Sequence, residues 1–298
     1  MPYESRKPNH RDEPTVKAKK SFGQNFLVDG RVVDRIVTAL APRPDETIIE
    51  IGAGRGALTS RLVEKAGRLI AIEFDRDLVP PLREHFDSRS NFQLIESDAL
   101  LLDYCAVVSP ASNARVVANL PYYISTAILQ RLITYRACLT EMVLMLQREV
   151  VDRLSARPGS SDRGYLSVLV EASCDIDVLF DVAPGSFRPR PKVWSTVVRL
   201  APKPALDTND EQLLWQLVSA GFAHKRKTIF NNLRNAPSPL PAFFEAAGGV
   251  RHVLDGSGLD PGRRAETLTI DEWRRLSNAV TVFVGPTRLS SPGTTVLS

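Results

Sequence analysis

The stretch Asn119-Leu120-Pro121-Tyr122, which follows the apolar run RVVA, has the residue types and the spacing to bind an amine. Pro121 keeps Leu120 extended, so the Leu120 carbonyl points in a set direction. That carbonyl and the side-chain oxygen of Asn119 can both accept hydrogen bonds from one NH2 group. Tyr122 offers a face for base stacking, worth about 1–3 kcal/mol per base. The stretch predicts a site for a flat aromatic base with an exposed amine; the alternative is a core asparagine before a proline turn.

The chemistry expected of this stretch is methyl transfer to an adenine amine. The N6 lone pair of adenine is delocalised into the ring and is a poor nucleophile. Two acceptors on its hydrogens localise charge on the nitrogen and aim it at the methyl group of a sulfonium. Positioning and electrostatics then carry most of the rate enhancement, and no dedicated base is needed before attack. Asn119 keeps the site neutral, where a carboxylate would add a full charge.

The glycine-rich run EIGAGRGA (50–57) is a second candidate, because glycines let a backbone approach a ligand closely. It fits the loose dinucleotide pattern, and Glu73 lies 21 residues after Gly52, where a ribose-binding acid belongs. A nicotinamide dehydrogenase and a plain strand-to-helix turn are therefore both open. Glu50 with Gly52, Gly54 and Gly56 gives the E-x-G-x-G-x-G form typical of S-adenosylmethionine enzymes, which favours that cofactor.

Asp98 follows a third apolar segment and precedes the small residue Ala99. That position suits an acceptor for an adenine amine, with Ala99 against the ring. Taken singly, Asp98 is more typical of a helix cap or a turn. As the third acid at the end of a predicted strand, it indicates a nucleoside site.

The segment SFRPRPKVWS (186–195) combines an aromatic residue with cations on a proline-rich loop. Phe187 is a candidate to cover the other face of a base that has been flipped out of its stack. Arg188, Arg190 and Lys192 are candidates for phosphate contacts. The alternative is that Phe187 only packs.

The elements that must position these residues alternate between strands and helices. Strands are expected at 47–52, 68–73, 92–96, 115–120 and 141–147. Helices are expected at 57–66, 75–86 (kinked by Pro80 and Pro81), 125–133 and 148–156. Two β-rich runs, 175–184 and 192–202, predict an antiparallel hairpin at the sheet edge. The pattern predicts an α/β fold with a mostly parallel sheet covered by helices on both faces.

The chain divides into four predicted parts. Residues 1–20 are a flexible basic arm with Lys17, Lys19 and Lys20, and 21–204 form the catalytic domain. Helical segments at 211–234 and 269–280, the second opened by a capping box of Thr269 and Glu272, indicate a small all-α domain over 205–282. Residues 283–298 are expected to be disordered.

Composition narrows the class of protein. The 298 residues are 43% hydrophobic and 24% charged, as in soluble globular proteins. The sequence shows no apolar run of about 20 residues and no signal peptide, so we expect a cytoplasmic protein with no membrane contact. A net charge of +4 and a pI near 9.0 hint at a polyanionic partner, although a plain soluble surface fits equally well. Three separated cysteines predict reduced, structural thiols and no metal site.

The motifs together resemble the KsgA/Dim1 family of ribosomal RNA adenine N6-dimethyltransferases over nearly the whole chain. The combination of FGQNFL (22–27) with NLPY (119–122) carries the resemblance to rRNA adenine dimethylases. The segments HKRKTIFNNL (224–233) and DPGRRAETL (260–268) point to the small-subunit enzymes rather than the related Erm resistance methylases. The resemblance implies a seven-stranded Rossmann-like S-adenosylmethionine fold with a helical C-terminal domain.

The resemblance also implies a substrate and roles for residues. The substrate is two adjacent adenosines in the 3′-terminal hairpin loop of small-subunit (16S) rRNA, in the assembling subunit, and the enzyme is expected to be a monomer. Asn119, Leu120 and Tyr122 hold the target base, and Phe187 covers it. The implied cofactor contacts are Asn25, Leu27, Gly52, Glu73, Asp98 and Asn119. Tyr123 departs from the Asn common at this place in the family, which puts substrate detail in doubt more than activity.

The basic segment HKRKT (224–228) has two interpretations. By itself it is a solvated helix face. Beside a base pocket, Lys225, Arg226 and Lys227 are predicted to contact RNA. Rival functions for the whole chain are a catalytically idle assembly or transcription factor, an Erm-type enzyme that modifies large-subunit RNA, and the dehydrogenase.

Overall fold

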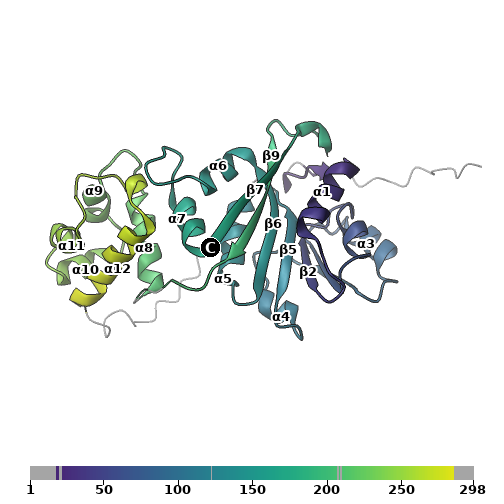
Figure 1. Cartoon of the computed structure of the whole chain (residues 1–298), viewed down its shortest axis with the longest axis horizontal. Helices are drawn as coiled ribbons and strands as arrows, with labels where there is room; N and C mark the ends of the chain where they lie inside the picture. The colour runs from purple at the N-terminus through teal and green to yellow at the C-terminus, as the bar shows by residue number, and fades with distance from the viewer. Residues whose placement is uncertain (1–17, 20–21, 122, 207, 209, 285–298) are drawn as a thin grey trace, which may run out of the picture.

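The computed structural model describes residues 18–19, 22–121, 123–206, 208 and 210–284. Most of the predicted basic arm, Tyr122 and the tail from residue 285 onward lie outside the described residues. Figure 1 shows a sheet flanked by helices, with a group of helices at one end of the molecule.

A seven-stranded sheet forms the centre of the larger part, as predicted. Its strand order is β4-β3-β2-β5-β6-β9-β7, in which β9 runs antiparallel to both of its neighbours and the other pairs are parallel. The strands are β2 (Thr47–Ile51), β3 (Arg68–Glu73), β4 (Phe92–Glu96), β5 (Ala114–Asn119), β6 (Leu139–Gln147), β7 (Cys174–Val182) and β9 (Ser195–Pro202). The hairpin predicted at the sheet edge is confirmed as β7 and β9.

Helices cover both faces of the sheet because alternate residues of each strand face opposite sides. Ile49 of β2 packs in a cluster with Leu129 of α5, whereas its neighbour Ile48 packs with Ile36 of α1 on the other side (Figure 1). The helices of this part are α1 (Gly30–Leu40), α2 (Thr59–Leu62), α3 (Val79–Phe86), α4 (Tyr104–Val108), α5 (Ser125–Thr134), α6 (Arg148–Leu154) and α7 (Tyr165–Ser173).

Two helices differ from the sequence expectation. The prolines predicted to kink the helix at 75–86 instead lie in the first turn of α3, where a missing N–H costs nothing. Helix α1 was not predicted, although Asp29 caps its first turn and its apolar residues are spaced to face the sheet.

The connection between β7 and β9 also joins the N-terminal segment to the sheet. It contains a short 3-10 turn, η2 (Pro184–Ser186), and the two-residue strand β8 (Phe187–Arg188). Strand β8 pairs antiparallel with β1 (Phe26–Leu27), and Val28 N donates to Ser186 O over 2.9 Å. The predicted loop is therefore held at its start by backbone hydrogen bonds.

The helical group begins after β9 and packs around the buried Trp273. Its elements are α8 (Glu211–Gly221), α9 (Ile229–Arg234), α10 (Leu240–Ala246), α11 (Val250–Gly256), η3 (Ala265–Thr267) and α12 (Ile270–Val284). The predicted capping box is confirmed: Thr269 N donates to Glu272 Oε2 over 2.8 Å, and Glu272 N to Thr269 Oγ1 over 3.2 Å. Helix α12 reaches 284, so the helix continues past the predicted end of the domain at 282.

The segment predicted as one helix over 211–234 is broken between α8 and α9, so HKRKT is a turn and not a helix face. Thr228 caps the N-terminus of α9. The Asn232 side chain donates to the carbonyls of Gly221 and His224 and closes the turn. The three cations of this turn are exposed.

The prediction of reduced thiols is wrong for two of the three cysteines. Cys105 and Cys138 form a disulfide, with their Cα atoms 5.5 Å apart. They are 33 positions apart in the chain, but α4 and the start of β6 meet at the same end of the sheet. Cys174 is free and buried, and burial raises the pKa of its thiol to about 12.

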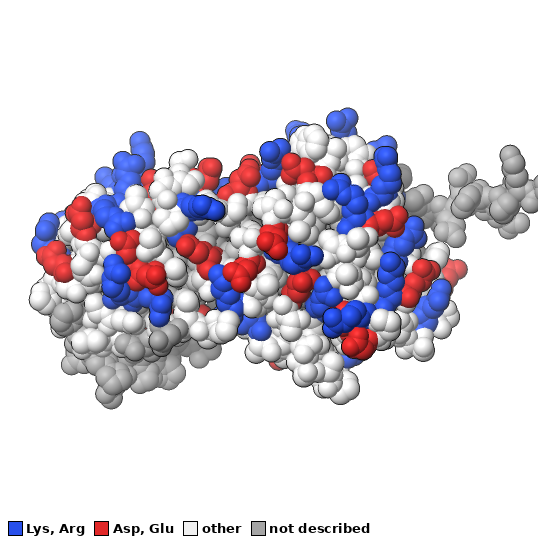
Figure 2. All heavy atoms as spheres, in the orientation of Figure 1, with Lys and Arg blue, Asp and Glu red and all other residues white. Residues whose placement is uncertain are grey.

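Acidic and basic side chains alternate over the surface. Figure 2 shows Lys and Arg interspersed with Asp and Glu across this face of the molecule. The excess positive charge of the chain, +4 in total, therefore does not form a single basic patch on this face.

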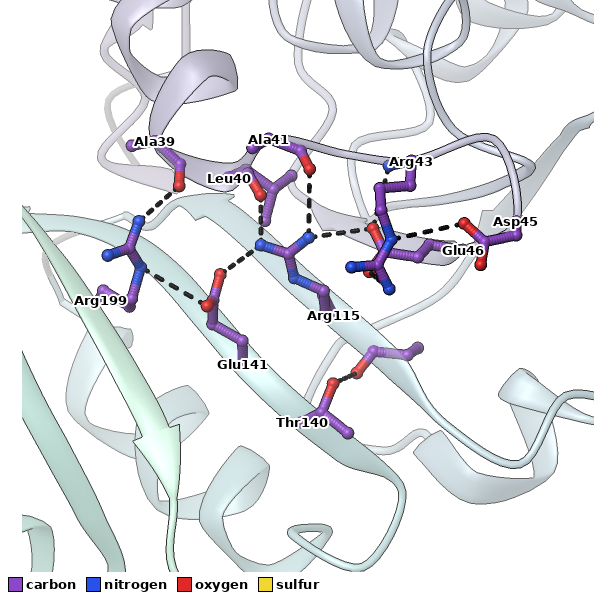
Figure 3. A network of polar contacts seen from close by, with 11 residues as sticks. Ala39, Leu40, Ala41, Arg43, Asp45, Glu46, Arg115, Thr140, Glu141 and Arg199 are labelled. Atoms are coloured by element: carbon purple, nitrogen blue, oxygen red, sulfur yellow. Dashed lines mark hydrogen bonds and ion pairs between the residues drawn. The ribbon is translucent and has the colours of Figure 1, made fainter.

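A polar network fixes α1 to the amino-terminal end of the sheet (Figure 3). Arg115 of β5 pairs with Glu46 over 3.0 Å and with Glu141 of β6 over 2.6 Å. Its guanidinium also donates to the Leu40 carbonyl, and Arg199 donates to the Ala39 carbonyl. The last carbonyls of a helix lack hydrogen-bond donors within the helix. These arginines supply donors to them and so hold the end of α1.

Candidate functional site

A cavity of about 340 Å3 opens at the carboxyl ends of β2, β3 and β5, where open α/β sheets bind ligands. Five segments line it: the N-terminal segment before β1, the glycine turn after β2, the end of β3, residues 97–100, and the residues after β5. Its walls include Gln24, Asn25, Gly52, Gly54, Glu73, Asp75, Asp98, Ala99, Asn119 and Leu120. Its size lies within the usual range for a small-molecule site, about 300–1,000 Å3.

The glycine turn lies against Glu73. Gly52 and Gly54 have φ values of 74° and 59°, which residues other than glycine rarely adopt. Gly54 N donates to one Glu73 carboxylate oxygen and Asp75 N to the other, each over 2.8 Å. Burial raises the pKa of Glu73, although these hydrogen bonds oppose the shift. Each oxygen keeps acceptor capacity for a ribose hydroxyl, because an ionised carboxylate offers about four lone-pair sites.

Glu50, the acid inside the glycine motif, does not line the cavity. Its side chain is buried and accepts a hydrogen bond from Thr59 Oγ1 over 2.7 Å. Burial raises the pKa of this carboxyl to about 8, so it is mainly protonated at neutral pH. It therefore joins the glycine turn to α2 without adding a charge.

Asp98 combines the two roles considered from the sequence. One carboxylate oxygen accepts from Leu100 N over 2.9 Å, as in a turn. The residue also lines the cavity beside the buried Ala99. The Ala99 carbonyl accepts from the Tyr104 hydroxyl over 2.8 Å, which holds this wall in place.

Asn119 ends β5 with its side chain at the cavity. Its amide nitrogen donates to the Asn25 carbonyl over 3.2 Å. Since a carbonyl can only accept, this contact fixes the nitrogen toward Asn25 and leaves the side-chain oxygen as an acceptor. Leu120 N donates to Met145 O over 3.3 Å, while the Leu120 side chain is buried. The two predicted acceptors therefore come from neighbouring residues on one wall.

Two predicted site residues are not brought to this wall, and Tyr122 lies outside the described residues. Leu27 and Phe187 face each other across the β1–β8 pair and are buried in the cluster under α1, and neither lines the cavity. The Phe187 ring is only 1% exposed, which supports the alternative that it packs. Its role in covering a base stays a prediction.

Asp75 is a site residue that the sequence analysis missed. It lines the cavity, is buried, and accepts hydrogen bonds from Lys19 Nζ over 2.5 Å and from Gln24 Nε2 over 2.7 Å. Burial alone acts to raise the pKa of Asp75, but these two donors outweigh it and hold the pKa below its usual value. Within the predicted basic arm, Lys19 therefore contacts the wall of the cavity. The stretch AIEFDRDL (71–78) contains Asp75 two positions after Glu73.

Aromatic side chains at the cavity were also missed. Phe22 and Phe74 line it, with ring centroids 5.5 Å apart, and Phe74 is 54% exposed. Tyr123 lines it as well and is 59% exposed. A Cβ at Gly23 would come within 3.2 Å of the Tyr123 ring, so this glycine allows the ring to lie against the N-terminal segment.

The predicted RNA-binding cations lie outside the cavity. Arg188, Arg190 and Lys192 are exposed on the β7–β9 connection, and Lys225, Arg226 and Lys227 on the α8–α9 turn. Across the described residues, no carboxylate forms an ion pair with any of these six. Arg188 instead donates to the carbonyls of Gly185 and Phe187.

The described part of the chain contains no group of three or more His, Cys, Asp or Glu side chains placed to hold a metal ion. None of its helices combines the length and the apolar character needed to cross a bilayer.

Solved structures share this fold. The chain is similar to a dimethyladenosine transferase from Plasmodium falciparum, with a TM-score of 0.71 and 25% identity, over 84% of this chain and 95% of that one. It is also similar to the 23S rRNA methyltransferase ErmE, with a TM-score of 0.60 and 26% identity, over 86% and 99% of the two chains. The fold and the cavity define an S-adenosylmethionine-dependent methyltransferase of the Rossmann-like class.

Sequence comparisons narrow this class to a family. The model of the family Ribosomal RNA adenine dimethylase matches residues 15–275. The ribosomal RNA small subunit methyltransferase A of Chromohalobacter salexigens is 44% identical over 286 residues, covering 94% of this chain and 97% of that protein. The protein of the same name in Xanthomonas campestris is 45% identical over 268 residues, covering 89% and 97%. The chain belongs to the ribosomal RNA adenine dimethylase family, as its motifs predicted, and the dehydrogenase alternative is wrong.

Proposed function

We propose that this enzyme transfers methyl groups from S-adenosylmethionine to the N6 amines of two adjacent adenosines in the 3′-terminal hairpin loop of small-subunit (16S) rRNA. One observation carries the proposal. Asn119 ends β5, and its side chain is oriented by a hydrogen bond to Asn25. Leu120 follows it, and both residues line the cavity that the glycine turn also lines. A nucleoside amine and a methyl donor can meet there.

The cavity residues fit the cofactor. Gly52 and Gly54 leave room for a ligand to approach their backbone, since a Cβ at Gly52 would meet nothing closer than 3.9 Å on the protein. Glu73 would hold the ribose hydroxyls, and Asp98 with Ala99 the adenine. Asn25 closes the side formed by the N-terminal segment. When bound, S-adenosylmethionine supplies an electrophilic methyl group on a sulfonium.

The protein's own part in the reaction is to hold the target amine. In the first transfer, the Asn119 side-chain oxygen and the Leu120 carbonyl each accept one N6 hydrogen, which fixes the direction of the nitrogen and increases its electron density. In the second transfer, one of these acceptors holds the single hydrogen that remains. Neither acceptor is basic enough to remove a proton, so the proton released after transfer leaves through the open side of the cavity. Tyr122 provides the stacking face for the base.

The substrate class follows from the relatives and the surface. Proteins 44–45% identical to this chain are named for the small ribosomal subunit. Exposed cations on the β7–β9 connection and the α8–α9 turn offer phosphate contacts on both parts of the molecule. We place the reaction on the assembling small subunit in the cytoplasm. We also propose that the enzyme acts as a monomer.

The test is transfer of labelled methyl groups to purified ribosomal subunits from a strain that lacks this modification. We expect label in small-subunit rRNA as N6,N6-dimethyladenosine and none in large-subunit rRNA. Label in large-subunit RNA alone would favour an Erm-type enzyme. Cofactor binding without any transfer, in a folded protein, would favour an assembly factor that has no catalytic activity.

A further inference from the structure

Trp194 is an exposed aromatic residue at the same edge of the sheet as the cavity. It immediately precedes β9 and its side chain is 48% exposed. Its carbonyl accepts from Arg148 N over 3.0 Å, so the backbone is fixed even though the ring is exposed. Within the described residues, no aromatic ring stacks on the indole and it belongs to no apolar cluster.

The strand register places Trp194 near the target site. Asn119 pairs with Met145 of β6, and Met145 pairs with Val197 of β9. Ser195 pairs with Gln147, so Trp194 lies three residues beyond Val197, in the direction of the carboxyl end of β6. Two strand spacings of about 4.8 Å across the sheet and three residues of about 3.3 Å along the strand put Trp194 about 14 Å from Asn119. That separation is about four stacked nucleotides at 3.4 Å each, and fewer in an extended strand.

Three cations precede this ring on the same connection. Arg188, Arg190 and Lys192 are exposed, and no carboxylate of the described residues forms an ion pair with them. Figure 2 shows blue spheres at the upper edge of this face, over the connection between β7 and β9. The β1–β8 pair and the buried Phe187 and Pro191 hold the connection, so it requires little ordering on binding.

We propose that Trp194, with Arg188, Arg190 and Lys192, forms a subsite for a single-stranded RNA nucleotide that flanks the target adenosine. The flanking base stacks on the indole, and the cations hold the adjoining phosphates. An apolar protein partner would not need three cations without carboxylate partners on this connection. The proposal rests on the proposed function, since it specifies how the RNA strand is held while one adenosine occupies the cavity.

The test compares Trp194→Ala, Trp194→Phe and the control Val178→Ala, which alters an exposed apolar residue on β7. In steady-state methylation of under-methylated small subunits, Trp194→Ala should raise KM for RNA by about five- to a hundredfold. The KM for S-adenosylmethionine and the kcat should change less than about twofold, because the cavity is intact. Trp194→Phe should recover most of the affinity, and Val178→Ala should match the wild type.

Abasic substitution identifies the stacked base. RNA fragments carrying one abasic site at each position around the target adenosine are assayed with the wild type and with Trp194→Ala. At one flanking position, the penalty of Trp194→Ala should disappear, because the base is already missing. Quenching of tryptophan fluorescence by intact RNA should be smaller in Trp194→Phe than in the wild type.

The outcomes separate this proposal from the proposed function. If the wild type methylates rRNA and the Trp194→Ala KM is unchanged, the subsite is wrong and the function stands. If Trp194→Ala weakens binding to assembled subunits but not to naked rRNA, the ring contacts a ribosomal protein and the RNA subsite is again wrong. If the wild type transfers no methyl group to any rRNA, the proposed function itself fails.

Discussion

At the residue scale, the Asn119 amide is oriented by a residue 94 positions earlier in the chain. The Asn25 carbonyl receives its nitrogen, and Asn25 Nδ2 in turn donates to Gly23 O over 3.0 Å. The N-terminal segment thus sets which atom of Asn119 faces the cavity. The motifs FGQNFL and NLPY therefore depend on each other physically.

Glu50 gives a pH-dependent prediction at the same scale. Its pKa is about 8 in the folded protein against 4.5 as the ordinary value, so between these pH values the folded state holds a proton that the unfolded state releases. Stability should therefore fall as pH rises across this window, by roughly a few kcal/mol at most. Glu50→Gln removes this term while keeping a polar partner for Thr59.

Denaturant unfolding of Glu50→Gln and the wild type at pH 5 and pH 8 checks this. The two proteins should be closest in stability at pH 5, and the variant should be the more stable one at pH 8. A stability difference that is the same at both pH values would show that Glu50 is ionised in the folded protein.

Several site residues could be predicted because strand ends and acidic residues are visible in a sequence. Glu73, Asp98 and Asn119 reach the cavity for that reason. Leu27 does not, whereas Phe26 does, because successive residues of a strand face opposite sides. The pairing of β1 with β8, which determines those sides, joins residues about 160 positions apart and cannot be read from local spacing.

At the element scale, the N-terminal segment forms a wall of the cavity through Asp75. Asp75→Asn should weaken S-adenosylmethionine binding by about three- to tenfold, because a neutral amide holds Lys19 and Gln24 less well than a charged acceptor. The melting temperature should change little, since Lys19 is one-third exposed and such ion pairs contribute little to stability.

The matched control is Asp77→Asn. Asp77 also pairs with Lys19, over 2.7 Å, but is 61% exposed and does not line the cavity. Calorimetric titration should give it a cofactor affinity close to that of the wild type. Equal losses in the two variants would mean that general charge, and not the anchored segment, determines binding.

Elements with strong periodicity were predictable, and breaks within them were not. The strands of the sheet lie within three residues of their predicted bounds because each contains a short apolar run. The predicted helix over 211–234 divides because Asn232 closes a turn back to Gly221 and His224, a tertiary contact. The disulfide between Cys105 and Cys138 likewise depends on which ends of the sheet meet.

At the scale of the whole molecule, the α8–α9 turn should extend RNA binding onto the helical group. Replacing Lys225, Arg226 and Lys227 together by Ala should weaken binding to small-subunit rRNA. If all three contact phosphates, the slope of log affinity against log salt should become shallower by about 2. The kcat at saturating RNA should stay near that of the wild type, because the turn does not line the cavity.

A charge-matched control separates contact from net charge. Lys65, Arg83 and Arg89 are exposed around α2 and α3, and their triple Ala variant changes the net charge equally. Filter binding across a salt series should leave the control slope close to the wild-type value. Identical slopes for the two triple variants would show that only overall charge matters.

The most direct test of the central claim is single-turnover methyl transfer by Asn119→Ala, with S-adenosylmethionine binding measured on the same preparation. We expect methylation of under-methylated small subunits to fall at least about a hundredfold, because one of the two acceptors that orient the amine is lost. The protein should remain folded and still bind S-adenosylmethionine. Its affinity for the cofactor should fall less than about tenfold, since the other cavity residues are unchanged. Transfer at the wild-type rate in that variant would contradict the account.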